Sequence, residues 1–158
     1  MEKLLTVSVA AYNGAATLQK ALESCLVADE SLQALLDVII IDDMISSGES
    51  IIEVATELKR RKANRIFAAA TFGLFTNGLE KFDKAYEEGV LTGVLTTNLI
   101  YQSPELLAKD YYISCDMSKY IALLIDTLNH DASISSILDP SERIQHVVEK
   151  YKKGEAID

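Results

Sequence analysis

Apolar residues along the chain follow two alternating patterns. Short runs of apolar, mostly β-branched residues, such as Val38 to Ile41, are typical of strands buried in a parallel sheet. Between these runs, apolar residues recur every three or four positions, as at Ile51, Val54 and Leu58, which is typical of an amphipathic helix. This alternation predicts an α/β fold with a doubly wound, Rossmann-like parallel sheet. Strands are expected at residues 6–11, 38–41, 65–71, 90–96 and 111–115, and helices at 15–27, 49–62, 78–88, 118–128 and 141–152.

Length and composition indicate one compact α/β domain over residues 1–158. The chain is 49% hydrophobic and 25% charged, as expected for a globular protein of this size. The formal net charge of −9 argues against a nucleic-acid-binding surface. The basic run Lys59-Arg60-Arg61-Lys62 ends a predicted helix, where its charge complements the helix dipole. We interpret this run as a solvated helix end, with a phosphate or partner patch as the alternative.

Two cysteines, Cys25 and Cys115, lie far apart along the chain. Such spacing does not indicate a disulfide framework or a metal site, so both are predicted to be buried free thiols. The N-terminus lacks the long apolar region of a signal peptide, and no apolar run approaches the ~20 residues of a membrane span. A cytoplasmic location and no membrane partner are therefore expected.

The segment from Val38 to Ser50 carries most of the functional information. Its apolar run is followed by Asp42 and Asp43, then by the small residues Ser46, Ser47 and Gly48, and then by a predicted helix start at Glu49. Backbone N–H groups at a helix N-terminus bind phosphate. Carboxylates beside them can hold sugar hydroxyls or a Mg²⁺ ion bound to a phosphorylated sugar. The alternative is a solvated acidic turn in which Ser47 caps the helix.

Ligands of parallel α/β sheets bind beyond the carboxyl ends of the strands. Several polar residues of the predicted loops belong to that edge. Single members have simpler explanations, since Tyr12 can cap the core and Asn13-Gly14 is a turn signal. The two histidines, His130 and His146, are predicted to be surface residues. The polar edge residues are Tyr12, Asn13, Asp42, Asp43, Ser46, Ser47, Thr71, Gly73, Thr76, Asn77, Thr97 and Asn98.

Residues 37 to about 150 resemble the ribose-phosphate pyrophosphokinase family, which has a type I phosphoribosyltransferase fold. The Asp42–Ser50 segment resembles its phosphoribosyl-pyrophosphate loop, and Ala-Ala-Thr-Phe-Gly-Leu-Phe at 69–75, Thr-Asn-Leu-Ile at 97–100, Asp-Met-Ser at 116–118 and the Ser-rich stretch at 133–138 follow in the family's order. The resemblance implies that ribose 5-phosphate or phosphoribosyl pyrophosphate binds at Asp42, Asp43, Ser46, Ser47, Gly48, Glu49 and Ser50. It also implies Mg²⁺ held through the ligand at Asp42 and Asp43.

The same resemblance implies a nucleotide side formed by Thr71, Phe72 and Gly73, although Phe72 stands where the family has a histidine. The family reaction converts ATP and ribose 5-phosphate to phosphoribosyl pyrophosphate and AMP in nucleotide biosynthesis. Its N-terminal half and basic catalytic loop are not recognisable in this sequence, so the chain is expected to be inactive alone. The family also implies a homo-oligomer. A non-catalytic regulatory or chimeric protein is the alternative to an enzyme.

Residues 1–36 resemble a different family, the start of the family 2 (GT-A) glycosyltransferases. The resemblance rests on an apolar strand that ends in Ala11-Tyr12-Asn13, where Tyr12 and Asn13 are expected on the nucleotide side. The chain is therefore interpreted as a possible chimera of two families that meet on the strand at 38–43. A nucleotide-sugar-binding fragment remains a further alternative. The first two strands are expected to be parallel neighbours, connected by the helix at 15–27.

Overall fold

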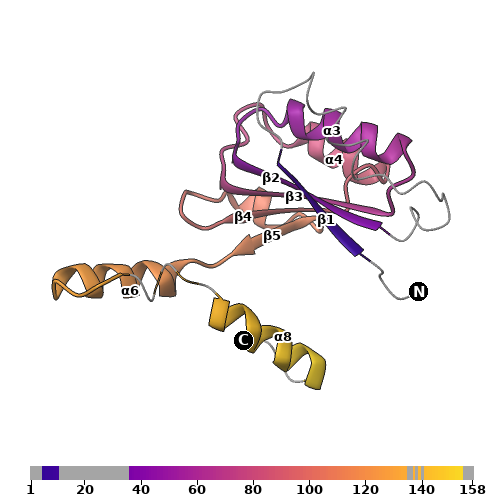
Figure 1. Ribbon diagram of the computed structural model, residues 1–158. Helices are drawn as coiled ribbons and strands as arrows, with labels where there is room; N and C mark the ends of the chain where they lie inside the picture. The colour runs from indigo at the N-terminus through magenta and orange to yellow at the C-terminus, as the bar shows by residue number, and fades with distance from the viewer. Residues whose placement is uncertain (1–4, 11–35, 135–136, 138, 140, 155–158) are drawn as a thin grey trace. The chain divides into compact units, whose positions relative to one another are not determined.

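The structure is a computed structural model that describes residues 5–10, 36–134, 137, 139 and 141–154. The chain divides into two compact units, Met1–Asp116 and Met117–Asp158. The first unit contains the sheet and the second contains helices (Figure 1). The predicted helix at 15–27 lies outside the described residues. The expectation of a single domain stays a prediction.

A five-stranded parallel sheet, in the order β1-β2-β3-β4-β5, forms the centre of the first unit (Figure 1). The predicted α/β class with a parallel sheet is confirmed, but the strands follow one another from β1 to β5 without the reversal of order that a doubly wound sheet has. β1 pairs with β2 in the register Leu5↔Leu36 to Ala10↔Ile41, so the expected parallel pairing of the first two strands is also confirmed. The strands are β1 (Leu5–Ala10), β2 (Leu36–Ile45), β3 (Arg65–Gly73), β4 (Gly93–Thr97) and β5 (Tyr112–Cys115).

Two amphipathic helices, α3 (Glu49–Arg60) and α4 (Glu80–Glu87), lie over the same face of the sheet (Figure 1). The apolar side of α3 buries Ile51, Val54 and Leu58. Alternate residues of the central strands meet them from the sheet, because successive side chains of a strand point to opposite faces. The fully buried core members include Ile40, Ile66, Val94 and Phe82.

Several element boundaries differ from the sequence-based prediction, and two of the differences have a clear structural cause. β2 continues beyond Asp43 to Ile45, because β3 extends beside it in the register Met44↔Phe72 and Ile45↔Gly73. β4 begins at Gly93 instead of residue 90, because the amides of Val90 and Leu91 both donate to the Ala85 carbonyl and close the end of α4.

The predicted long loop at 99–109 contains a short helix, α5 (Pro104–Leu107). The Ser103 side chain accepts a hydrogen bond from the Leu106 amide at 3.1 Å, and Pro104 occupies the first turn. Serine at the N-cap and proline directly after it are the usual helix-start residues. The signal was therefore present in the sequence, and α5 was missed because it is only one turn long.

The second unit contains α6 (Ser118–Asn129) and α8 (Ser141–Lys153). Both predicted helices are confirmed to within one residue. α6 has no buried residue, and its apolar side chains include the exposed Leu123, Ile125 and Leu128. Burial of an apolar side supplies most of the stability of a helix in a protein, and α6 lacks such a buried side among the described residues.

Candidate functional site

The predicted loop lies between the end of β2 and the start of α3. Asp42 and Asp43 are still within β2, three and two residues before its last residue Ile45. Ser46, Ser47 and Gly48 then complete the connection to the first turn of α3, which starts at Glu49 and Ser50. The structure therefore brings the two carboxylates and the helix N-terminus to the same edge of the sheet.

The two carboxylates form an exposed to half-buried pair at this edge. The Asp43 amide donates to Asp42 Oδ1 at 2.9 Å. Loss of solvent around Asp42 raises the pKa of its carboxyl, and the adjacent Asp43 carboxyl adds to the rise against the lowering effect of that amide. Within the described part of the chain neither carboxylate forms an ion pair, so a cation near them would relieve their mutual repulsion.

Gly48 determines the shape of the loop. Its φ of +76° lies in the left-handed region, which glycine adopts without steric cost. A Cβ atom placed on Gly48 would lie 2.2 Å from Phe82 Cζ, so the backbone of the loop touches the buried ring on α4. Gly48 is also the N-cap residue of α3, and the Ser47 hydroxyl, one residue earlier, accepts a long hydrogen bond of 3.5 Å from the Glu49 amide.

Hydrogen bonds connect the carboxyl-terminal loops of each pair of adjacent strands from β2 to β5. From β2 to β3, the Thr76 amide donates to the Ser46 carbonyl at 3.0 Å, and the two hydroxyls lie 3.3 Å apart. From β3 to β4, Thr97 Oγ1 donates to the Thr71 carbonyl at 2.6 Å. From β4 to β5, Asn98 Nδ2 donates to Asp116 Oδ1 at 2.7 Å. The predicted collection of polar residues on one edge is therefore present from β2 to β5.

This constellation can be compared with known proteins. The sequence model of one family, described as phosphoribosyl synthetase-associated domain, matches residues 26–139. The chain belongs to this family. Among curated relatives, the ribose-phosphate pyrophosphokinase of Vibrio cholerae is 33% identical over 103 residues, which is 65% of this chain and 32% of that protein. The enzyme of the same name from Pyrococcus furiosus is 36% identical over 74 residues, 45% of this chain and 26% of that protein.

The fold of this chain also resembles a solved structure, phosphoribosylpyrophosphate synthetase from Mycobacterium smegmatis. That comparison has a TM-score of 0.58 at 18% identity and covers 80% of this chain and 46% of the other. At this identity the likeness shows the shared fold. The chain spans about one third of the length of the Vibrio cholerae relative. The match to the family begins at residue 26, within the segment 1–36 that was predicted to resemble glycosyltransferases.

The residues expected on the nucleotide side are only partly described. Tyr12 and Asn13 lie outside the described residues. Thr71 and Phe72 are exposed near the end of β3, and Gly73 is buried. A Cβ atom on Gly73 would lie 2.9 Å from the Thr96 side chain and 2.6 Å from the Phe75 ring. Gly73 therefore allows close packing beneath the loop, and the exposed Phe72 lies beside Met44 of β2.

Sequence reasoning missed a lysine beside the loop. Lys81, in the first turn of α4, forms an ion pair with Glu49 in the first turn of α3. Both residues line one groove of about 770 Å³ between the two helices, together with Glu53, Lys84 and others. Lys81 appears in the sequence as an ordinary surface position of an amphipathic helix. The inward-facing neighbour Phe82 could have indicated its position, because Lys81 must lie close to the part of the chain that the Phe82 ring contacts.

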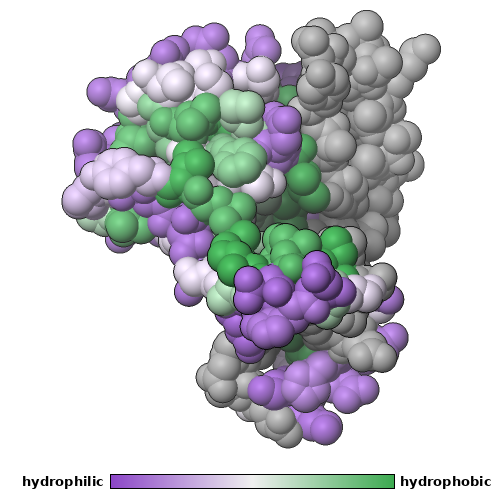
Figure 2. All heavy atoms as spheres, turned by 90° about the vertical axis from the view of Figure 1, so that its left-hand side faces the viewer, coloured by the Kyte–Doolittle hydropathy of each residue, from purple (hydrophilic) through white to green (hydrophobic). Residues whose placement is uncertain are grey.

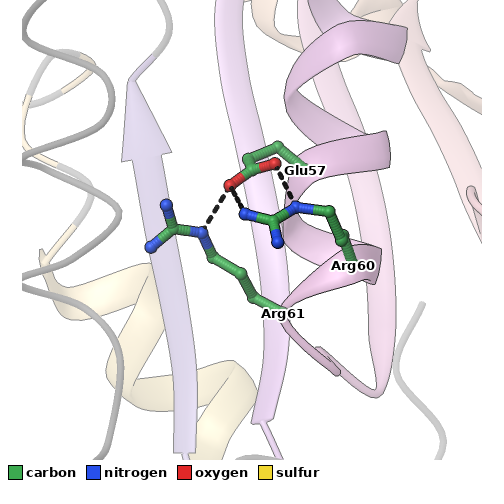
Figure 3. A network of polar contacts seen from close by, with 3 residues as sticks. All are labelled: Glu57, Arg60 and Arg61. Carbon is green, nitrogen blue, oxygen red and sulfur yellow. Dashed lines mark hydrogen bonds and ion pairs between the residues drawn. The ribbon is translucent and has the colours of Figure 1, made fainter.

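The basic residues at the end of α3 form hydrogen bonds within this helix and to the residues directly after it. Arg60 donates to both carboxylate oxygens of Glu57, and Arg61 Nε donates to Glu57 Oε1 at 2.6 Å (Figure 3). The hydrogen bond from Arg60, and after it the one from Arg61, are the largest causes that lower the pKa of the Glu57 carboxyl to about 2. Lys59 Nζ donates to the Asn64 carbonyl. These contacts favour the interpretation of a solvated helix end over a phosphate patch.

Other sequence candidates contribute little to the edge. His130 and His146 are exposed on the second unit, as predicted. Cys115 is a free thiol but only partly buried, and Cys25 lies outside the described residues. Among the residues described, no group of three or more metal-ligating side chains occurs. Within that same part of the chain, no helix has both the length and the apolar character to cross a bilayer.

Proposed function

We propose that this chain binds the ribose 5-phosphate unit of ribose 5-phosphate or phosphoribosyl pyrophosphate at the end of β2. The phosphate is bound by backbone N–H groups of Ser46 to Ser50, and Asp42 and Asp43 face the sugar hydroxyls. The observation that carries the proposal is the placement of an adjacent carboxylate pair beside the start of α3, in a chain that belongs to the phosphoribosyl synthetase-associated family. Helix N-termini of this kind favour phosphate oxygens.

Magnesium fits the proposed site through its ligand. Mg²⁺ prefers carboxylate oxygens and retains several waters, and one or two carboxylates together with substrate oxygens usually complete its coordination. Asp42 and Asp43 supply two such carboxylates, and partial burial together with the neighbouring Asp43 carboxyl raises the pKa of Asp42. Bound Mg²⁺ would also reduce the repulsion between these acids and the ligand phosphate.

Titration with ribose 5-phosphate tests the proposal. Amide resonances of Ser46 to Ser50 are expected to shift at millimolar ligand, and the apparent affinity is expected to increase when Mg²⁺ is added. Ribose without phosphate serves as the matched control ligand and should leave those amides in place. Unchanged resonances in every titration would show that the loop does not bind the sugar phosphate.

Catalysis is a separate part of the proposal. The relatives are named for the ribose-phosphate pyrophosphokinase reaction, and phosphoryl-type transfer from ATP requires cations over the transferring group. The described end of β2 presents mainly carboxylates and hydroxyls, so we infer that this chain binds ligand without turning it over alone. AMP release from ATP and ribose 5-phosphate above the background of a chain-free mixture would contradict this inference.

The resemblance of residues 1–36 to glycosyltransferases stays a prediction. β1 is the element of that segment which the structure describes, and a first strand parallel to the second suits both families. The family match over residues 26–139 supports the pyrophosphokinase-like function for that part of the chain.

We also propose that the chain associates with itself through an apolar patch formed by Met44, Phe72 and Leu74. These side chains are 43%, 38% and 46% exposed, and the β2–β3 register places Met44 beside Phe72. Figure 2 shows that apolar residues, in green, are exposed on the face turned to the viewer. Patches of this kind on soluble proteins often mark interaction sites.

Sedimentation at high micromolar concentration should show a species larger than the monomer. Leu74→Lys is expected to shift the population toward monomer, because it places a charge in the patch. Leu107→Lys makes the same chemical change at a leucine of α5 that is 52% exposed and outside the patch, and it should leave association unchanged. A wild-type chain that sediments as a monomer would rule out this mode of association.

A further inference from the structure

Lys81 is held beside the proposed phosphate loop by packing on its own helix. Its neighbour Phe82 is 1% exposed and contacts the loop at Gly48. This contact fixes the first turn of α4 against the start of α3. Lys81 then reaches across the groove, and its ammonium group binds the Glu49 carboxylate.

The loop and the end of β2 carry negative charge, which the nearby Lys81 partly neutralises. Asp42, Asp43 and Glu49 place three carboxylates along eight residues of chain. Glu49 lies in the first helical turn, where its negative charge is favourable for the helix but competes with a phosphate for the same N–H groups. The Lys81 hydrogen bond lowers the pKa of Glu49, a carboxylate that is already ionised at neutral pH at its ordinary pKa. Without a cation, the loop would repel the phosphate that it is proposed to bind.

We propose that Lys81 is the cation that faces the ligand phosphate, and that Glu49 holds this lysine near the loop when no ligand is bound. The inference rests on the proposed function. A phosphate at the start of α3 and the Glu49 carboxylate would compete for one ammonium group. Lys81 therefore favours phosphorylated over neutral sugars, and Glu49 limits the affinity of the site.

The next cation on α4 provides a comparison. Lys84 also lines the groove, but its Nζ lies 3.7 Å from Glu88 Oε1, at the far end of α4 from the loop. Its side chain is 74% exposed, against 49% for Lys81. Lys81 and Lys84 thus carry the same charge on the same helix, and only Lys81 is paired with a residue of the proposed loop.

Ribose 5-phosphate affinity of the full chain, measured in Mg²⁺ at low salt, tests the inference. Lys81→Gln is expected to weaken binding about tenfold, from the Coulomb interaction of one charge with a doubly charged phosphate about 5 Å away, acting largely through water. Lys84→Gln should change binding by less than about twofold, because the charge is more distant and screened. Glu49→Gln should strengthen binding about threefold, since it frees Lys81 for the phosphate.

Two further readouts separate an electrostatic role from a structural one. Binding should depend less on salt in Lys81→Gln than in the wild-type chain, whereas a lysine that only supports the fold would not alter that dependence. All three variants should unfold at nearly the wild-type temperature, because a surface ion pair contributes little to stability.

The possible results are distinct. If Lys81→Gln and Lys84→Gln bind alike, or if Glu49→Gln weakens binding, Lys81 is not the phosphate-facing cation, and the proposed function still stands. If the wild-type chain binds no ribose 5-phosphate, both the proposed function and this inference are wrong.

Discussion

Gly48→Ala is expected to destabilise the chain by about 3 kcal/mol, through two effects that add. The residue has a φ of +76°, which costs an alanine roughly 1 kcal/mol. The new methyl group would also lie 2.2 Å from Phe82 Cζ, and inserting a carbon into a packed core costs about 1–3 kcal/mol. Phe82 is 1% exposed and packs edge-on against Phe75, so it has little room to move.

Urea unfolding followed by circular dichroism measures this loss. Gly89→Ala is the matched control, since Gly89 also has a positive φ, +67°, but a Cβ there meets nothing within 4 Å. It should cost only about 1 kcal/mol, from the backbone strain alone. Equal stability losses in the two variants would mean that the contact between Gly48 and Phe82 does not constrain the loop.

Replacing Asp42 and Asp43 together by asparagine is expected to reduce Mg²⁺-supported binding of ribose 5-phosphate by a factor of ten or more. Asparagine keeps the shape of each side chain but removes the charge that attracts Mg²⁺. In the absence of Mg²⁺ the same variant should bind at least as well as the wild-type chain, because two carboxylates no longer repel the phosphate. The signature is thus the loss of the Mg²⁺ dependence.

Calorimetric titration with and without Mg²⁺ gives both quantities. The double variant Glu53→Gln and Glu87→Gln removes two negative charges from exposed positions of α3 and α4, and its binding should keep the Mg²⁺ dependence. Removal of the raised-pKa carboxyl of Asp42 should not lower thermal stability. A Mg²⁺ effect of wild-type size in the Asp42 and Asp43 variant would exclude these residues from the metal-dependent part of the site.

Local pattern was sufficient to predict most of the fold. The buried run at Val38 and the helical spacing from Ile51 to Leu58 each reflect one face of one element, so their class can be read from neighbouring residues. Boundaries were less predictable where a distant partner sets them. β2 continues past its two acids because β3 pairs with Met44 and Ile45, and no residue of β2 itself shows this.

The site followed the same division. Asp42, Asp43 and the small residues after them were found because they are adjacent in sequence. Lys81 lies 32 residues from Glu49 and was missed, because its role depends on the packing of Phe82 against Gly48. Thr97 and Asn98 were predicted for the edge, but their hydrogen bonds to Thr71 and Asp116 show that they also join neighbouring strand ends.

The consecutive order of the strands has a consequence for how the sheet assembles. Paired residues are 28 positions apart between β2 and β3, as in Asp37↔Arg65, and 18 apart between β4 and β5, as in Val94↔Tyr112. The entropy of closing such loops grows only slowly with length, so each pairing has a similar kinetic cost. No residue from β2 to β5 pairs with one more than 28 positions away within this part of the sheet, so no strand has to wait for a segment synthesised much later. The sheet can therefore grow one strand and its connection at a time, in the order in which the ribosome releases them.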